Sequence, residues 1–388
     1  MIEFITLMSL FLVAYHHVIY PLLLAWLGDR QGRSASESSA QKLPNEPAQW
    51  PRIELLIPAY NEQDYVADKL WMLAFLDYPA ERLSIRLLCD GCTDDTVSVA
   101  RQTLTQLPFC EFSIEVAEYA NNRGKVALLN EAIAASTADI VALSDVSAII
   151  SVDAMKMAAR HFQLTDVGVV CGSYQLLNPG SDGEAKYWQY QRKVRQNEAN
   201  LGALQGAHGA FYLIRREAFC TLKSDTINDD FMLPMNIVAQ GYRGVYEPTI
   251  CALELEHASD ALDRKRRRRI GAGNLQQLIR LRQLLLPRFK GVAFTFVSGK
   301  ALRVLCPFLV LASMVGAALL ASNSIWFAGL LALQVLGIAL ALLPRLNPSY
   351  AWPSLLKALN YLIEGHWNCL LGCISYVQQS VMRRLGRA

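Results

Sequence analysis

Carboxylates stand at three places in this sequence where an apolar run meets polar residues. Asp90 and Asp145 each end such a run, and the pair Asp229 and Asp230 opens a segment with helical spacing. In an open α/β sheet, ligands bind outside the carboxyl ends of the strands, so aspartates there can meet a sugar or nucleotide hydroxyl. The recurrence of this pattern predicts one acidic cleft built from distant parts of the chain.

Each carboxylate also has a simpler explanation. Asp90-Gly91 is an ordinary turn dipeptide, and an Asp-Asp pair at a helix start satisfies free backbone N–H groups and the helix dipole. The functional hypothesis requires these carboxylates to bind a metal ion and to act as a base. Mg²⁺ or Mn²⁺ prefers carboxylate oxygens together with phosphate oxygens and water. A carboxylate beside a second one, near a helix N-terminus, can be tuned to act as a base.

Cations are the second requirement for chemistry on a substrate that carries a diphosphate. Lys125 and the run from Arg266 to Arg269 are the candidates, and the run belongs to consecutive cations at residues 264–269. The run can equally be a solvated or lipid-facing stripe at a membrane surface. Charge alone leaves both interpretations open.

Composition bounds the function classes. Hydrophobic residues make up 53% of the 388 residues, which is high for a soluble enzyme, and the net charge of +3 is too small to argue for nucleic acid. The nine cysteines are scattered and odd in number, as expected in a reducing compartment. Cys89 and Cys92 match a C-x-x-C pattern, but no second pair stands nearby, so a redox role is not favoured.

Residues 4–27 form an apolar run of the length that crosses a bilayer. No small-residue cleavage site follows the run, which favours a retained anchor over a cleaved signal peptide. His16 and His17 lie in its middle. We expect these imidazoles to be neutral and packed against other helices rather than to bind a metal.

The C-terminal part of the chain is also membrane-like. Residues 304–321 and 324–343 are the best spanning candidates, whereas residues 292–303 carry two cations and suit a helix that lies in the interface. Residues 355–382 are interrupted by charged residues, and we expect an interfacial or re-entrant segment there. This topology places the α/β region and the C-terminal arginines in the cytoplasm, as the positive-inside rule prefers.

Strand and helix patterns alternate between the two membrane regions. Apolar runs predict strands, and apolar spacings of three and four residues predict helices. The predicted strands are 53–57, 85–89, 112–117, 139–144, 167–172, 209–214 and 242–247, and the predicted helices are 64–75, 94–107, 125–135, 184–201 and 228–240. This alternation predicts an α/β fold with a doubly wound, mostly parallel sheet.

These patterns divide the chain into four parts. They are a transmembrane anchor at 1–28, a linker rich in Ser, Ala, Glu, Gln and Pro at 29–51, a cytoplasmic α/β domain at 52–286, and a C-terminal membrane region at 287–388.

Six motifs, in order along the chain, carry a resemblance to a known family. They are Pro58-Ala59-Tyr60-Asn61-Glu62, Asp90 in DGCTDDT, Arg123-Gly124-Lys125 before a helix, Asp145 at the first position of D-x-D, Gly206-Ala207-His208-Gly209-Ala210, and Asp229-Asp230 at the last two positions of T-E-D. Residues 52–284 resemble a membrane-anchored family 2 glycosyltransferase. That family contains inverting nucleotide-sugar enzymes of GT-A fold, among them the cellulose, hyaluronan and chitin-type synthases.

The resemblance implies a role for each matched residue. Asp230 is expected to be the catalytic base with Asp229 beside it, and Asp145 to hold Mg²⁺ or Mn²⁺ on the diphosphate. The donor is expected to be a UDP-sugar. The residues expected to bind substrate are Pro58, Ala59, Tyr60, Glu62, Asp90, Lys125, His208, Arg266 and Arg269.

Two positions depart from the pattern of the family. The second carboxylate of D-x-D is replaced by Ser147, so metal binding rests on Asp145. In the Q-x-x-R-W signature of polymer-making members only Arg269 is kept, and Ile270 replaces the Trp. The second departure favours transfer of one or a few sugars over processive synthesis.

The sequence therefore predicts an inverting glycosyltransferase of the cell (inner) membrane that moves a sugar to a hydroxyl acceptor, in polysaccharide or glycolipid synthesis. Its expected partners are a nucleotide sugar, a lipid-linked or saccharide acceptor, the bilayer and proteins of envelope polysaccharide assembly, with no nucleic acid. The alternative is a non-catalytic nucleotide-sugar-binding membrane protein with a degenerate transferase domain, which Ser147 and Ile270 motivate. No G-x-G-x-x-G follows the first strand, which disfavours a nicotinamide dehydrogenase.

Overall fold

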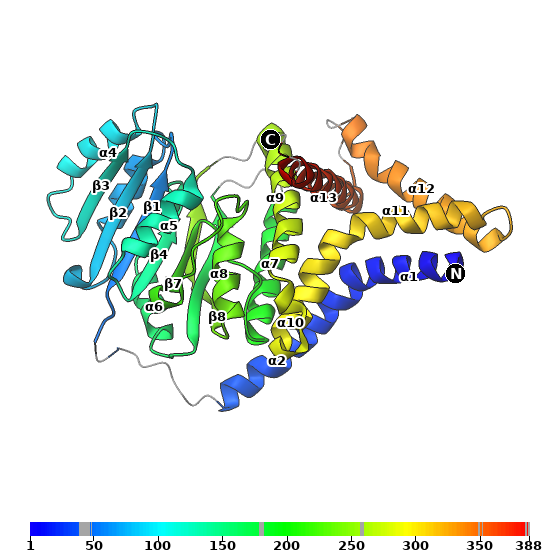
Figure 1. The fold of residues 1–388 in the computed structure, drawn as a ribbon, viewed down its shortest axis with the longest axis horizontal. Coiled ribbons are helices and arrows are strands. Elements are labelled where there is room, and N and C mark those ends of the chain that lie inside the picture. The colour runs from blue at the N-terminus through cyan, green and yellow to red at the C-terminus, as the bar shows by residue number, and fades with distance from the viewer. Residues whose placement is uncertain are drawn as a thin grey trace. The chain divides into compact units, whose positions relative to one another are not determined.

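The computed structural model describes residues 1–38, 47, 49–177, 182–256, 260–347, 350, 352–384 and 386. The chain divides into two compact units. The sheet unit consists of Leu27–Gly180 and Trp188–His257, and the helical unit consists of Met1–Trp26, Ser181–Tyr187 and Ala258–Ala388. Figure 1 shows the elements of both units, most of them labelled.

The sheet unit is built on one eight-stranded sheet with the order β3-β2-β1-β4-β7-β6-β8-β5. Its strands are β1 (Ile53–Ala59), β2 (Leu83–Asp90), β3 (Ser113–Tyr119), β4 (Ile140–Ser144), β5 (Ala148–Ile150), β6 (Val167–Leu176), β7 (Phe211–Arg215) and β8 (Arg243–Glu254). β1 is parallel to β2 and β4, and β2 is parallel to β3, whereas β7 runs antiparallel to β4 and β6. The predicted mostly parallel α/β sheet is confirmed.

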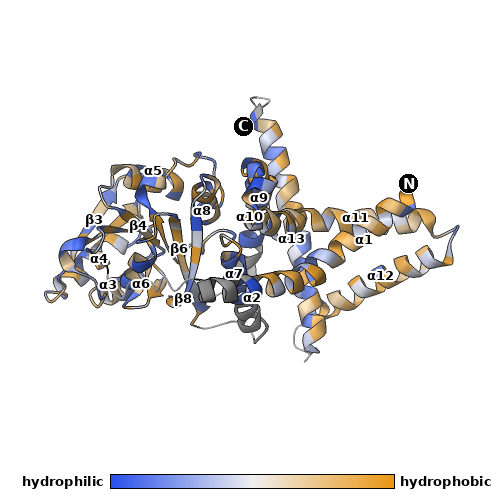
Figure 2. Ribbon diagram, turned by 90° about the horizontal axis from the view of Figure 1, so that it is seen from below, coloured by the Kyte–Doolittle hydropathy of each residue, from blue (hydrophilic) through white to orange (hydrophobic). Residues whose placement is uncertain are grey.

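Helices cover both faces of this sheet. They are α3 (Val66–Leu73), α4 (Thr96–Thr105), α5 (Lys125–Ala135), α6 (Ala154–His161) and α8 (Asp229–Ala239), while α7 (Asp182–Asn200) lies between β6 and β7 in the sequence. Figure 2 shows α3, α4 and α6 along one side of the strands and α5 and α8 along the other. β1 is therefore buried on both faces, which explains its almost wholly apolar sequence.

Sequence patterns missed two short elements, β5 and α6, and ended several strands too early, β8 by the most residues. The predicted strand 242–247 stops before Pro248, whereas β8 continues through it. The register between β6 and β8 shifts after Gly172, where residues 248–250 form a bulge. A bulge takes a proline out of the hydrogen-bonded ladder, so Pro248 does not end the strand.

The carboxyl ends of β2, β1 and β4 lie together at one edge of the sheet. β1 lies between the other two strands, with Ala59 opposite Cys89 and Leu56 opposite Leu143. The strand order changes direction at β1 and β4, which makes this edge the kind of switch point where α/β sheets bind ligands. Asp90 ends β2 and Asp145 follows β4 at this edge.

The helical unit carries the apolar helices. Its elements are α1 (Ile2–Ala14), the start of α2 (Tyr20–Ser38), α9 (Asp260–Arg280), α10 (Gly291–Thr295), α11 (Leu302–Leu320), α12 (Ile325–Leu346) and α13 (Ser354–Arg384), with π-helical segments at Tyr15–Ile19 and Phe296–Ala301. Among the described residues, three stretches are long and apolar enough to span a membrane: Ile2–Arg30, Gly291–Leu320 and Ile325–Leu346. Figure 2 shows the hydrophobic character of α1, α11 and α12.

Two predicted boundaries differ from the structure. The linker expected at 29–51 begins later, because α2 continues to Ser38; residues 39–46 and 48 lie outside the described residues. The α/β domain was expected to reach residue 286, but α9 groups with the helical unit. In that unit α9 packs along α13 and its Arg268 Nε donates to Asn368 Oδ1 at 3.3 Å, which holds the helix there.

Two segments of the predicted C-terminal membrane region form longer continuous helices than expected. Residues 292–303 continue directly into α11 instead of forming a separate interfacial helix. Their cation Lys300 donates to Asn274 Oδ1 at 2.8 Å, so its ammonium group has a hydrogen-bond partner within the unit. Residues 355–382 lie within one uninterrupted helix, α13, which argues against a re-entrant segment.

Gly91 sets the turn that follows Asp90, and this generates a stability prediction. Its φ is +67°, and a Cβ there would lie 2.3 Å from the backbone nitrogen of Asn122. Gly241 has φ +103° with nothing within 4 Å of a Cβ, so it is the matched control. We expect Gly241→Ala to cost about 1 kcal/mol from backbone strain alone, and Gly91→Ala to cost clearly more. Thermal unfolding of the purified protein tests this, and equal melting temperatures would contradict it.

Candidate active site

Lys125 lies at the junction of the acidic residues that follow the strands. It is the first residue of α5, and its Nζ lies 2.7 Å from Asp145 Oδ1 and 3.6 Å from Asp229 Oδ2. Asp145 comes from the end of β4 and Asp229 from the first turn of α8. One ammonium group therefore joins two carboxylates that are far apart in the sequence.

Asp145 and Asp230 both face Gly209. A Cβ on Gly209 would lie 3.0 Å from Asp145 Oδ2 and 3.7 Å from Asp230 Oδ2. The missing side chain therefore leaves space beside two carboxylate oxygens. A small hollow at this place is lined by Pro58, Lys125, Asp145, Gly209, Tyr212 and Asp229.

The local charges shift two pKa values. Partial burial and then the neighbouring Asp229 carboxylate raise the pKa of Asp230 to about 6, although the Lys125 cation acts in the opposite direction. Desolvation disfavours the charge of Lys125, but Asp145 and Asp229 outweigh it and raise the pKa of the ammonium. At neutral pH the site thus combines a stable cation with a carboxylate of near-neutral pKa, which suits a general base.

Asp90 is buried at the end of β2 and faces the segment that leads into α5. Its Oδ2 accepts the backbone N–H groups of Arg123 at 3.0 Å and of Gly124 at 2.8 Å. Its Oδ1 lies 3.6 Å from Arg123 Nε and has no hydrogen-bond partner among the described residues. Asp90 therefore holds the residues that precede Lys125, and its Oδ1 is a buried oxygen paired, in the described part of the chain, only with the Arg123 guanidinium.

The loops that follow β1 and β2 are fastened to each other. Asn61, in a left-handed conformation with φ 57°, accepts the N–H of Thr93 at 2.9 Å, and the N–H of Glu62 donates to Thr96 Oγ1 at 2.7 Å. Tyr60 is exposed beside them, whereas Ala59 is buried in β1. The Pro58–Glu62 motif and the Asp90 motif, predicted separately, form one connected wall.

Glu62 lies in a strongly acidic part of this wall. Burial, and after it the charges of Asp145 and Glu256, raise the pKa of Glu62 to about 7. A bound cation or a hydroxyl donor would relieve this repulsion. Glu62 is therefore suited to binding polar groups of a ligand near Asp145.

His208 and the two arginines complete the residues predicted from sequence. His208 stacks on Tyr174, with ring centroids 3.6 Å apart, and its Nδ1 accepts the N–H of Ala210. His208 also directly precedes Gly209 in the chain. Arg266 and Arg269 are exposed on α9 in the helical unit, and their assignment to the diphosphate stays a prediction.

Lys69 is a buried residue that the sequence reasoning missed. Its Nζ donates to Ser144 Oγ at 2.6 Å and to the backbone carbonyl of Ala148. Lys69 therefore ties down both ends of the turn that carries Asp145. The signal was present, because Lys69 is three residues after Val66 and four before Leu73, on the apolar stripe of the predicted helix.

A family described as "Glycosyltransferase like family 2" matches residues 51–273. Similar curated proteins include the poly-beta-1,6-N-acetyl-D-glucosamine synthases of Staphylococcus aureus (strain MSSA476) and Staphylococcus epidermidis, each 26% identical over 204 residues. Each match covers 50% of this chain and 48% of the relative. The chain thus spans about half the length of the curated relatives it matches.

A similar solved structure is the mannosyltransferase PcManGT from Pyrobaculum calidifontis, in complex with GDP-Man and Mn²⁺. It has a TM-score of 0.72 and 22% sequence identity, and the likeness covers 96% of this chain and 99% of that chain. The expected GT-A type of fold is therefore confirmed.

The burial of Lys69 leads us to predict that the stability of the protein depends on pH. Burial lowers the pKa of its ammonium to about 7, below its value in the unfolded chain, although nearby carboxylates act in the opposite direction. The unfolded chain then binds more protons than the folded chain between pH 7 and the ordinary lysine pKa, so stability contributed by this residue rises with pH across that window. In Lys69→Met this rise should be absent. Melting temperatures of both proteins from pH 7 to 10 test it, and parallel curves would contradict it.

Proposed function

This chain belongs to glycosyltransferase family 2, and from that premise we propose that it transfers a sugar from a nucleoside diphosphate to a hydroxyl acceptor, with inversion at the sugar's anomeric carbon. The observation that carries the proposal is the meeting of Lys125 with Asp145 and Asp229, and of Asp145 with Asp230 at Gly209. A candidate base, a cation and further carboxylate oxygens then lie within one site, as this reaction requires.

The proposed reaction needs two events at the anomeric carbon. Asp230 accepts the proton of the acceptor hydroxyl while that oxygen forms the new bond to the carbon. The bond from the carbon to the phosphate oxygen breaks on the opposite face, and the nucleoside diphosphate leaves with that electron pair. Lys125 stabilises the negative charge that develops on the leaving group.

The carboxylate oxygens at this site fit a divalent cation, Mg²⁺ or Mn²⁺. Asp145 Oδ2 and Asp230 Oδ2 border the space that Gly209 leaves open, and hard cations take oxygen ligands of this kind. Such an ion would neutralise charge on the diphosphate of the donor. Asp145 would hold it, since Ser147 offers no second carboxylate in that motif. The Mn²⁺ in the mannosyltransferase supports this assignment by analogy.

The nucleotide is proposed to lie on the wall formed by the loops after β1 and β2. Asp90 Oδ1 and Glu62 are its polar groups, with Pro58, Ala59 and Tyr60 beside them. A UDP-sugar is the donor predicted from sequence, and GDP-Man in the mannosyltransferase makes a guanine nucleotide the competing choice.

The acceptor is proposed to be a lipid-linked or growing saccharide at the cytoplasmic face of the cell membrane. The apolar stretches of the helical unit support membrane association. The curated relatives make a polysaccharide, which supports synthesis of a polysaccharide or glycolipid. Proteins of envelope polysaccharide assembly are then the expected partners.

A panel of nucleotide sugars tests the function directly. The purified full-length protein is incubated with UDP- and GDP-sugars, Mn²⁺ and a membrane lipid extract, and release of nucleoside diphosphate is measured. We expect release with one donor class and an inverted product linkage. Tight nucleotide binding without any turnover would support the alternative of a degenerate transferase, which the Ser147 and Ile270 substitutions motivate.

Asp230→Asn should lower turnover by about 10²- to 10⁴-fold, because a positioned base contributes that much. Binding of the nucleoside diphosphate should change far less than turnover, since Asp145 holds the cation and the proposed contact of Asp230 is with the acceptor hydroxyl. Asp68→Asn, at an exposed position of α3, is the matched control and should keep full activity. Near-normal turnover of Asp230→Asn would remove this residue from the base role.

The raised pKa of Asp230 predicts the pH dependence. Because the base must be ionised, kcat/KM should rise with pH through a midpoint of about 6. Lys125 lowers this pKa, so Lys125→Gln should move the midpoint to higher pH, while Lys125→Arg should leave it near the original position. Rates fall in both variants, and the midpoint is the informative measurement. The same midpoint in both variants would refute the electrostatic coupling.

A further inference from the structure

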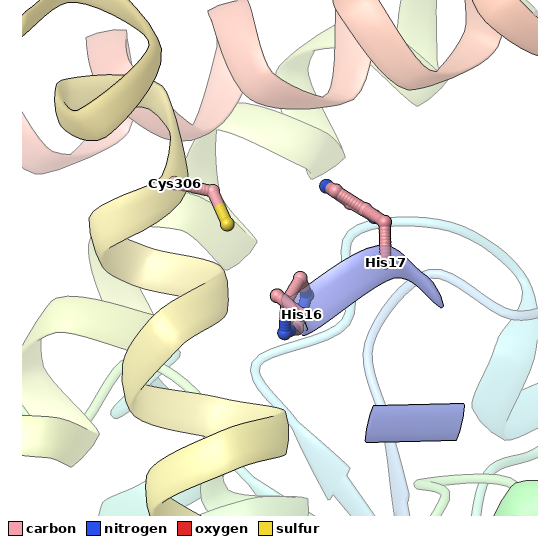
Figure 3. Close-up of side chains that lie close together, drawn as sticks. All are labelled: His16, His17 and Cys306. Atoms are coloured by element: carbon pink, nitrogen blue, oxygen red, sulfur yellow. The ribbon is translucent and has the colours of Figure 1, made fainter. Parts of the chain in front are cut away.

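Three potential metal ligands meet among the apolar helices of the helical unit. A ring nitrogen each of His16 and His17 and the Sγ of Cys306 all lie within 4.8 Å of one another. His16 is 7% exposed and Cys306 is fully buried. Figure 3 shows the three side chains directed into the space between the N-terminal helix and α11. The sequence alone suggested only packing for this histidine pair.

The two histidines lie in a π-helical segment, and a second π-helical segment directly precedes α11, the helix that carries Cys306. His16 and His17 lie in the π-helical segment Tyr15–Ile19, and the second π-helical segment, Phe296–Ala301, faces it. Tyr15 Oη and Ser298 Oγ are 2.9 Å apart across the two segments. π-helical turns inside α-helices are rare and often mark functional sites.

The hydrogen bond of His16 prepares its ring for a metal. His16 Nδ1 lies 2.8 Å from the backbone carbonyl of Ser298, which can only accept, so Nδ1 carries the proton and donates. This leaves the lone pair on Nε2. Histidines that bind metals commonly donate their other N–H to a carbonyl in this way, which fixes the tautomer and the ring orientation.

His17 has a further imidazole beside it. Its Nε2 lies 3.0 Å from Nε2 of His366 on α13. Two nitrogens bound tetrahedrally to one zinc ion at 2.0–2.1 Å would be about 3.3 Å apart, so a small movement would let both face the same ion. Without an ion, one of these nitrogens donates to the other.

We propose that His16, His17 and Cys306 bind a d¹⁰ transition-metal ion, Cu⁺ or Zn²⁺. The imidazole of His366, beside His17, would strengthen this binding. A thiolate with imidazoles selects these ions over Mg²⁺, Ca²⁺ and Mn²⁺, which prefer oxygen. Binding displaces the thiol proton of Cys306, so one proton is released for each ion bound.

The charges around the site favour one of the two ions over the other. Arg303 interacts electrostatically with the three histidines and with Cys306. Thiolate and Cu⁺ together are neutral, whereas thiolate and Zn²⁺ keep one positive charge near that guanidinium in an apolar environment. Cu⁺ is therefore expected to bind more tightly. This site is separate from Asp145 and independent of the proposed transferase reaction.

The test measures metal content and affinity of the full-length protein in detergent. The protein is purified with a tag free of histidine, stripped with chelator and titrated anaerobically with Cu⁺ or with Zn²⁺, each against a competing chelator. We expect about one ion per chain. Cys306→Ser, His17→Gln and His16→Asn should each lose it; in His16→Asn the amide can still donate to the Ser298 carbonyl. His366→Asn should weaken binding by about 10- to 100-fold, as loss of a supporting group does.

Matched controls separate this site from other thiols. Cys220→Ser, at an exposed thiol of the sheet unit, and Cys369→Ser, at a buried one of α13, should keep the ion. X-ray absorption of the loaded wild-type protein should show one sulfur at about 2.3 Å with nitrogens at about 2.0 Å, and it decides the question even if a ligand variant fails to fold. Stoichiometry near zero, retention in Cys306→Ser, or a spectrum without sulfur would each overturn the proposal.

Discussion

The acidic groups of the site lie together around a cation. Lys125 Nζ approaches Asp145 at 2.7 Å and Asp229 at 3.6 Å, and its positive charge offsets the electrostatic repulsion between these carboxylates. The position of this cation depends in turn on Asp90, which accepts the N–H groups of Arg123 and Gly124 just before α5. One chain of contacts thus runs from the end of β2 to the start of α8.

The rest of the sheet unit keeps this arrangement rigid. Buried Lys69 ties Ser144 to Ala148 and so holds the turn that carries Asp145. The loops after β1 and β2 are bonded to each other through Asn61 and Thr93. Functional side chains on loops need such support, because an error of about 1 Å in the placement of a reacting group can cost about 10²-fold in rate.

The helical unit meets a different constraint. Polar groups among apolar helices are costly unless they find partners, and here they find them locally: Lys300 donates to Asn274, and His16 donates to the Ser298 carbonyl. The two facing π-helical segments bring Ser298 and the histidines together. Histidine and cysteine in these positions are thereby placed for coordination chemistry, which their hydrophobic neighbours in the sequence do not suggest.

The sequence by itself determined the α/β class, most strands and helices, and the acidic motifs, because periodicity and turn residues are local properties of the chain. It missed β5, α6 and the extension of β8 past Pro248, where pairing with a neighbouring strand overrides local preference. Only the tertiary structure decided that Lys125 joins Asp145 to Asp229, that Lys69 is buried under Asp145, and that His16 meets Cys306. Electrostatic and coordination contacts act through space at a few ångströms, between residues whose separation along the chain carries no trace of their distance.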